Sequence, residues 1–205
     1  MKRIVNYINE KLHVTSKSFY TCQPKTRDEL QQIIIKRINE DGLECNLNDI
    51  DVSKIEDMGY LFNAAAYDVF NEFNGDISLW NVSNVKDMRG MFNRCEKFNC
   101  DLSKWDVSNV EKMLFMFNRC KNFNCDISHW DVSNVEDMME MFFMCNKFNC
   151  DISKWDVSNV TNMWGMFWGC KIFDCDLSNW NISNVENMDG AFYDCPTKPK
   201  WYKVK

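Results

Sequence analysis

The amino-acid sequence predicts an α/β repeat solenoid with a helical N-terminal cap, and two observations carry this prediction. A unit of 25 residues recurs without a gap from residue 73 to 197. Within each unit, apolar residues first alternate with polar ones and later recur at intervals of three and four. Self-similarity at such a period is typical of stacked repeats, because one unit cannot bury its apolar face alone. The five regular copies begin at Phe73, Phe98, Phe123, Phe148 and Phe173.

The regular unit changes its hydrophobic period along its length. In the copy that begins at Phe98, alternation over residues 98–102 predicts a short strand. Asp, Ser and Asn over residues 105–110 predict a turn. We therefore expect each unit to form a strand, a turn and a short helix whose Phe, Trp, Val, Met and Cys rows build the core. The helix is predicted by the spacing i, i+3, i+4 and i+7 of Met113, Met116, Phe117 and Cys120.

The repeat also predicts how the chain is divided. Residues 1–42 lack the unit and are expected to form a helical N-terminal cap, with a separate docking module as the alternative. Residues 43–197 are expected to form six coils, of which 43–72 is a diverged copy and 73–197 are the five regular ones. Residues 198–205 form a basic tail, in which Trp201 and Tyr202 are expected to cover the last coil.

Two helices are expected within residues 1–42. Apolar residues over 3–12 share one helical face. For the second helix, Thr26 is the expected N-cap and Glu29 completes a capping box. Asp41-Gly42 ends this helix. Its apolar stripe is formed by Leu30, Ile33, Ile34 and Ile38.

Composition excludes some classes of protein. The 24 Lys and Arg against 30 Asp and Glu give a net charge of −6, which argues against a nucleic-acid binder. No apolar run approaches the ~18 residues that cross a bilayer, so we expect no membrane span. The N-terminus has a basic opening but no apolar signal-peptide core, which predicts a cytoplasmic location.

Ten of the eleven cysteines occupy two positions of the repeat. Without an export signal we expect reduced thiols that act as small buried hydrophobes. The Cys-x4-Cys spacing and the presence of only two histidines argue against a metal site.

Two rows of carboxylates and one row of asparagines also recur. The Asp76 row and the Asp106 row are expected to cap turns, with a cation ladder as the alternative. The Asn84 row is expected to satisfy backbone groups. His129 lies beside Asp126 only because the rows place it there, so we predict no catalytic residue, no cofactor and no enzyme activity.

The motif Trp-Asp-Val-Ser-Asn-Val-x-x-Met-x-x-Met-Phe-x-x-Cys-x-x-Phe-Asn-x-Asp-Ile-Ser resembles the BspA-type leucine-rich-repeat surface protein family. The resemblance covers residues 43–197 and implies a right-handed, leucine-rich-repeat-like solenoid that binds proteins or surfaces. It implies no catalytic residues. Members of the family are typically bacterial surface proteins, so the resemblance implies the cell surface as the alternative location. Similar repeats in phage-borne proteins of gut bacteria imply a phage origin.

Positions that vary between copies point to a binding surface. They lie on the expected outer face of the short helix and carry apolar side chains in neighbouring copies, with two arginines beside them. Contiguous apolar patches mark interaction sites, and Trp, Tyr and Arg dominate binding energy there. The alternative is packing between coils. The candidate partner-binding residues are Leu114, Phe115, Met139, Phe143, Met144, Trp164, Trp168, Tyr193, Arg94 and Arg119.

The sequence therefore predicts a non-enzymatic protein-interaction module whose partner is another protein or a second copy of itself. Two alternatives stay open. One is a self-assembling structural protein, and the other is a bacterial or phage surface adhesin that binds a receptor.

Overall fold

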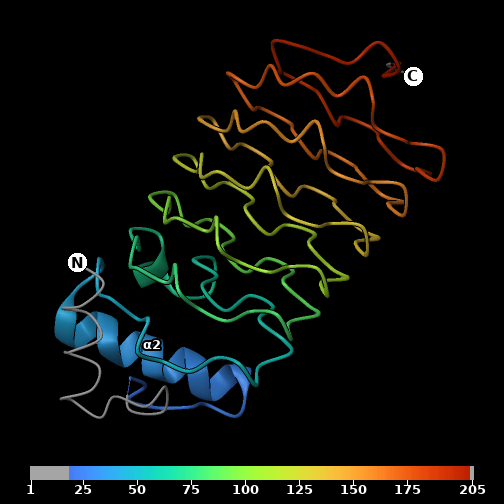
Figure 1. Ribbon diagram of the computed structural model, residues 1–205. Helices are drawn as coiled ribbons and strands as arrows, with labels where there is room; N and C mark the ends of the chain where they lie inside the picture. Colours follow the sequence, from blue (N-terminus) through green and yellow to red (C-terminus); the bar gives the residue numbers. More distant parts are fainter. Residues whose placement is uncertain (1–18, 204–205) are drawn as a thin grey trace, which may run out of the picture.

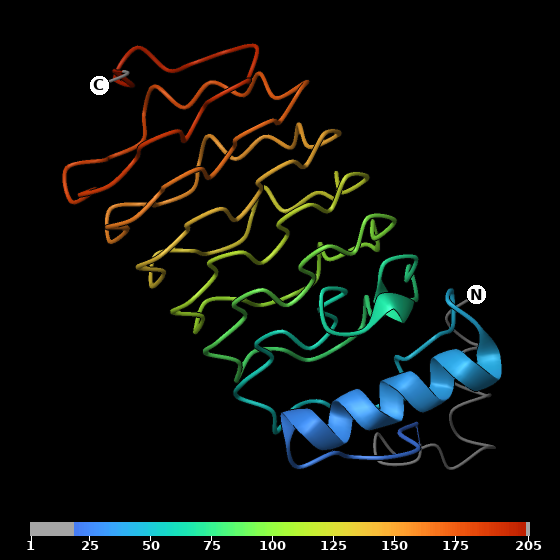
Figure 2. The same cartoon turned by 180° about the vertical axis from the view of Figure 1, so that it is seen from behind.

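The computed structural model describes residues 19–203, and the repeat copies form successive coils stacked along one axis (Figure 1). The regular elements in this range are the helix α2 (Arg27–Asp41) and the short 3-10 helix η2 (Asp68–Phe70). Helix α2 lies across the N-terminal end of the stack, and the C-terminus lies at the opposite end (Figures 1 and 2). The first helix expected, over residues 3–12, lies outside the described residues.

The expected second helix is confirmed as α2. Thr26 is its N-cap, and the Thr26 hydroxyl accepts a hydrogen bond from the Glu29 amide at 3.2 Å. The Glu29 carboxylate completes the cap one residue earlier than a capping box requires, because it accepts from the Lys25 amide at 2.8 Å. Gly42 ends the helix with φ 91°, a backbone conformation that favours glycine. The side chains that α2 buries are Leu30, Gln31, Ile34 and Ile38.

The α/β architecture expected for the coils is wrong, and so is its leucine-rich-repeat-like form. Within residues 43–197, the strand expected over 98–102 and the helix expected over 113–120 are both absent. Parallel pairing is reduced to isolated bridges, of which one column joins Asp57 to Asp87 and continues through each later coil to Asn187. The coils are built from tight turns.

Two consecutive turns replace the expected helix in each of the five regular coils. In the second coil, the Met91 amide donates to the Met88 carbonyl at 3.2 Å, and the Cys95 amide donates to the Phe92 carbonyl at 3.0 Å. The third residue of each turn has positive φ, 56° at Gly90 and 64° at Arg94 in this coil. An α-helix requires φ near −63°, so these residues interrupt any helix. A positive φ at the third residue is the signature of a type II turn.

The turns also explain why the sequence suggested a helix. Each four-residue turn directs its first and last residues inward, so two turns in series bury positions i, i+3, i+4 and i+7. A two-turn helix with one apolar face produces the same spacing. The predicted inward set in the second coil, which is fully buried, is Met88, Met91, Phe92 and Cys95.

Amide groups that the turns leave free join neighbouring coils. In the second coil, alternate amides donate to carbonyls of the third coil at 2.7–2.9 Å. The remaining amides form the hydrogen bonds that close the turns. Consecutive hydrogen bonds between two coils therefore never form, and no strand results. The donors are Met88, Gly90, Phe92 and Arg94, and the acceptors are Lys112, Leu114, Met116 and Asn118.

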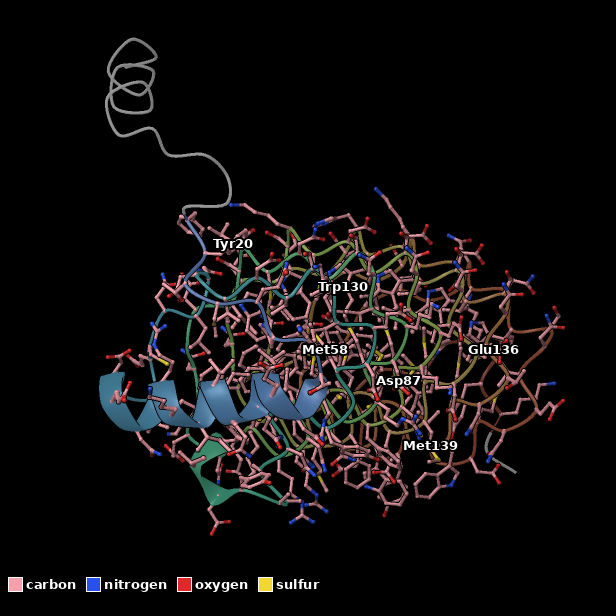
Figure 3. All side chains as sticks on the ribbon, turned by 90° about the horizontal axis from the view of Figure 1, so that it is seen from below. Tyr20, Met58, Asp87, Trp130, Glu136 and Met139 are labelled. Atoms are coloured by element: carbon pink, nitrogen blue, oxygen red, sulfur yellow. The ribbon has the colours of Figure 1, made fainter. Side chains whose placement is uncertain are left out.

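The predicted core rows are confirmed, since the Phe, Trp, Val and Met rows of the middle coils are buried. Figure 3 places Met58 inside the stack. Phe92 stacks on Phe98 at a centroid distance of 4.0 Å and on Phe117 of the next coil at 5.5 Å. Each repeat Trp donates its indole N–H to the preceding coil, as Trp155 does to the Ile127 carbonyl at 3.0 Å. The Trp row is therefore part of the scaffold.

The polar rows have the expected structural roles. Asp106 accepts from the Ser108 amide at 3.1 Å and from its hydroxyl at 2.7 Å, which lowers the pKa of this carboxyl. Asn109 donates to the Ser83 carbonyl of the preceding coil at 2.7 Å. The turn-capping prediction and the asparagine-ladder prediction are therefore confirmed.

All eleven cysteines lie within the described residues and are free thiols. In one row, each thiol donates to a backbone carbonyl of the preceding coil, as Cys120 does to Phe92 at 2.9 Å. Burial raises the pKa of Cys120, so the thiol stays protonated and unreactive. The expectation of small buried hydrophobes is confirmed for Cys95, Cys120, Cys145 and Cys170, whereas Cys195 in the last coil is only half-buried.

Candidate interaction face

The outer side of the paired turns carries the variable positions, and we name this surface the turn face. In the second coil it comprises Arg89, Gly90, Asn93 and Arg94, together with the equivalent residues of the other coils. The two central residues of each turn point away from the core, because the first and last residues are buried. Figure 3 shows Met139 on this outer side, away from Met58.

An aromatic column runs along the turn face across the last three coils. The rings of Phe143 and Trp168 lie 5.7 Å apart, and those of Trp168 and Tyr193 lie 4.4 Å apart. The guanidinium carbon of Arg119 lies 5.3 Å from the Phe143 centroid, within cation–π range. The exposure increases along the column: Phe143 and Trp168 are half-buried, whereas 57% of Tyr193 is exposed. The structure thus brings these four predicted residues together.

Two glycines make room for large turn-face side chains of the preceding coil, and one of these side chains belongs to the column. A Cβ atom on Gly190 would lie 2.9 Å from a ring carbon of Trp168, and one on Gly169 would lie 2.6 Å from the Met144 sulfur. Both glycines have positive φ, which suits the third position of a turn. The large side chain of one coil can therefore lie against the backbone of the next. Sequence reasoning missed this fit, although glycines at two variable positions were visible in the repeat.

The other predicted residues border two shallow hollows. Phe115, Arg94 and Arg119 line a hollow of about 300 Å³ together with Tyr60 and Glu140. Leu114 lines a different hollow of about 400 Å³, whose other lining residues are mostly charged. The predicted residues that are half-buried on the turn face are Leu114, Phe115, Met139, Phe143, Met144, Trp164 and Trp168.

Glu140 is a member of this surface that the sequence did not single out. Its carboxylate accepts a hydrogen bond from the buried side chain of Asn118. Partial burial raises the pKa of Glu140, and the bond to Asn118 and the nearby Arg119 oppose this rise. Glu140 therefore adds an acceptor beside the two arginines, which are exposed.

The hollow beside His129, of about 560 Å³, is lined mainly by polar side chains. His129 borders this hollow with Asp126, Asp151 and Lys154, and its ring contacts the Ser103 carbonyl. Asp126 accepts from the Ser128 amide at 3.0 Å, so this carboxylate is engaged in a turn. Within residues 19–203, no cluster of three or more His, Cys, Asp or Glu has an arrangement that could hold a metal ion.

Over the same described range, none of the helices has the length and apolar character needed to cross a bilayer.

A stack of 25-residue coils with a variable outer face defines the class of repeat proteins. Within this class, the sequence profile of the family described as "Mycoplasma protein of unknown function, DUF285" matches residues 34–142 and 102–201. These matches cover most of the chain, which therefore belongs to the DUF285 family. No curated protein and no solved structure matches the chain.

Proposed function

We propose that the chain is a non-enzymatic protein-interaction module that binds a protein partner through the turn face. The observation that carries the proposal is the column of Phe143, Trp168 and Tyr193, which becomes more exposed toward the last coil. The repeated Phe and Trp rows differ from this column, because they are buried between coils and are not available to a partner. Large aromatic side chains beside arginine are the residues that most often dominate binding energy.

The chemistry of the turn face suits a partner that has both apolar and acidic groups. Apolar side chains of the partner would cover Trp168 and Tyr193, whose contact area is still partly open to solvent. Acidic groups would pair with Arg94 and Arg119, for which no salt bridge is found among residues 19–203. The kinship with BspA-type surface proteins is our inference from the Trp-Asp-Val-Ser-Asn-Val motif, and it agrees with a binding role.

A capture experiment with two matched double variants tests the proposal. Trp164→Ala/Trp168→Ala removes the two large indoles of the turn face. Leu79→Ala/Ile172→Ala removes two apolar side chains outside this face, each of them 51% exposed. We expect chemical cross-linking in lysate to recover a partner with the wild type and the control variant, and to lose it with the Trp variant. Equal recovery by both variants would remove the turn face from consideration.

Self-association through the same face is the competing reading, and light scattering separates the two. We expect a monomer at high protein concentration. A concentration-dependent dimer or filament that the Trp variant abolishes would show that the partner is a second copy of the chain.

A further inference from the structure

We propose that the C-terminal edge of the stack, residues 186–194, is a second docking site, which binds an extended basic segment of another polypeptide through main-chain hydrogen bonds. The edge adjoins the turn face, whose members in the sixth coil include Asp189 and Tyr193, but the proposal rests on backbone groups at the end of the stack and not on the aromatic column.

Every earlier coil donates four amides to the coil that follows it. In the fifth coil, these bonds measure 2.7, 3.0, 2.8 and 2.9 Å. The same four positions donate in the first four coils, at 2.7–3.3 Å. The bonds of the fifth coil join the amides of Met163, Gly165, Phe167 and Gly169 to the carbonyls of Asn187, Asp189, Ala191 and Tyr193.

The sixth coil has the same four donors, and within residues 19–203 no further coil is stacked on it. Among residues 19–203, these amides have no acceptor. The carbonyl of Glu186 is also without a donor there, whereas the equivalent Thr161 carbonyl accepts from the Glu186 amide at 2.8 Å. A segment that binds parallel to the edge would therefore donate one amide to the Glu186 carbonyl. Further along, every second carbonyl of the segment would accept from one of the four free amides. The four donors are Met188, Gly190, Phe192 and Asp194.

Apolar side chains at this end are only partly covered. Ile182, Val185 and Met188 are half-buried, whereas their equivalents in the fifth coil, Val157, Val160 and Met163, are 1, 0 and 2% exposed. The C-terminal tail packs Trp201 and Tyr202 against Phe192. Its own backbone bond joins Tyr202 to Pro199, so the tail leaves the donor row free. Unpaired main-chain edges of this kind are sites where a peptide adds to a fold.

The charge of the sixth coil indicates a basic segment. Residues 173–197 contain five acidic residues and no Lys or Arg, and the four Lys of this end belong to the tail, residues 198–205. Glu186 and Asp189 are exposed, and neither forms a salt bridge among the described residues. Asp194 pairs with Lys171 of the preceding coil. Acidic side chains beside a donor row favour a partner that carries Lys or Arg.

A second copy of the chain does not complement this edge. In a tail-to-tail dimer, donors would face donors and form no bonds. In a head-to-tail arrangement, the required carbonyls belong to the first coil, and side chains of α2 already occupy two of them. Arg27 Nε donates to the Gly59 carbonyl at 2.8 Å, and Gln31 Nε2 donates to the Leu61 carbonyl at 2.7 Å.

The chain itself supplies a probe, because residues 112–119 occupy the equivalent edge of the second coil through four carbonyls. The probe is a synthetic peptide of residues 110–121 that carries Phe117→Ala and Cys120→Ser. The first change avoids competition with Trp201 and Tyr202 for Phe192, and the second prevents oxidation. A control peptide replaces Lys112, Arg119 and Lys121 with Glu.

Amide hydrogen exchange of the full chain is the measurement. In the free chain, we expect the amides of Met188, Gly190, Phe192 and Asp194 to exchange at least about 100-fold faster than the equivalent amides of the fifth coil, because they lack acceptors. Saturating probe is expected to slow them about tenfold or more, and the Glu peptide is not. Protection of these amides in the free chain, or no slowing by the probe, would overturn the proposal.

A pair of charge variants tests the acidic contribution. Asp189→Lys changes the edge, whereas Asp174→Lys makes the same charge change at an exposed position of the sixth coil outside the edge. We expect Asp189→Lys to weaken probe binding about tenfold and Asp174→Lys to leave it within about twofold. Equal weakening by both variants would refute a specific role for the edge.

Discussion

The two ends of the stack are closed in different ways, and the comparison shows that a repeat with directional hydrogen bonds has chemically unlike ends. The first coil presents carbonyls outward, and α2 covers them with the donors Arg27 and Gln31 and with a buried apolar stripe. The last coil presents amides, and the tail covers only part of it through Trp201 and Tyr202. One kind of cap therefore cannot serve both ends.

The largest expected effect comes from removing apolar packing at the N-terminal end. Ile34 is fully buried between α2 and the first coil. Ile34→Ala should lower the free energy of unfolding by about 2–5 kcal/mol, because it leaves a cavity. Urea denaturation measures this change, with Gln32→Ala on the exposed side of α2 as the control. A loss below about 1 kcal/mol would mean that the stack does not depend on this cover.

Removing one side-chain hydrogen-bond donor of α2 should lower the free energy of unfolding by a smaller amount. Gln31 is buried, and its side-chain amide donates to the Leu61 carbonyl at 2.7 Å. Gln31→Leu keeps the volume but leaves that carbonyl without a partner, which should cost about 1–3 kcal/mol. Thermal unfolding of this variant can be compared with that of Gln32→Leu. If both variants have the same unfolding temperature as the wild type, the carbonyl edge needs no donor from α2.

Removing a side-chain donor at the C-terminal end should lower the free energy of unfolding still less. Trp201 donates to the Leu177 carbonyl at 2.9 Å but is only half-buried. Trp201→Phe should therefore cost at most about 1 kcal/mol, because water can replace the lost donor. Trp155→Phe in the interior removes the equivalent bond to Ile127, and there we expect about 1–3 kcal/mol. Equal losses in urea denaturation would show that the last coil is closed as tightly as the interior.

The smallest effect concerns the row of Asp106, which over the five regular coils begins and ends with Asn and has Asp in between. Asn81 and Asn181 cap the same turn that Asp106 caps in the third coil. Bonds from Ser108 lower the pKa of Asp106 from its ordinary 3.8, so its stabilisation is present above that value and is lost as pH falls through the lowered one. Asp106→Asn should keep the turn within about 0.5 kcal/mol at neutral pH.

Acid titration of unfolding measures the difference between these two side chains. Below about pH 4, wild type should lose stability relative to Asp106→Asn. Parallel acid curves would mean that the charge of the carboxylate adds nothing to the turn.

Helix α2 and the core could be predicted from the sequence because local signals agree with the final packing. Thr26 and Gly42 bound α2, and the repeated Phe, Trp and Met positions are buried. The candidate site could be predicted only in part. Variation between copies pointed to Trp168 and Tyr193, but their approach depends on Gly190 of the neighbouring coil. Glu140 was missed because its environment forms only when Asn118 of another coil lies beside it.

The sequence by itself determined the period, the number of coils and the residues that face inward. Only the tertiary structure decided the path of the backbone, because a helix and two turns in series bury the same positions. The turns prevail here since left-handed residues such as Arg94 release alternate amides for the neighbouring coil. Direct contact between coils also fixes the direction of these bonds, and with it the difference between the covered carbonyl edge and the free amide edge at Met188–Asp194.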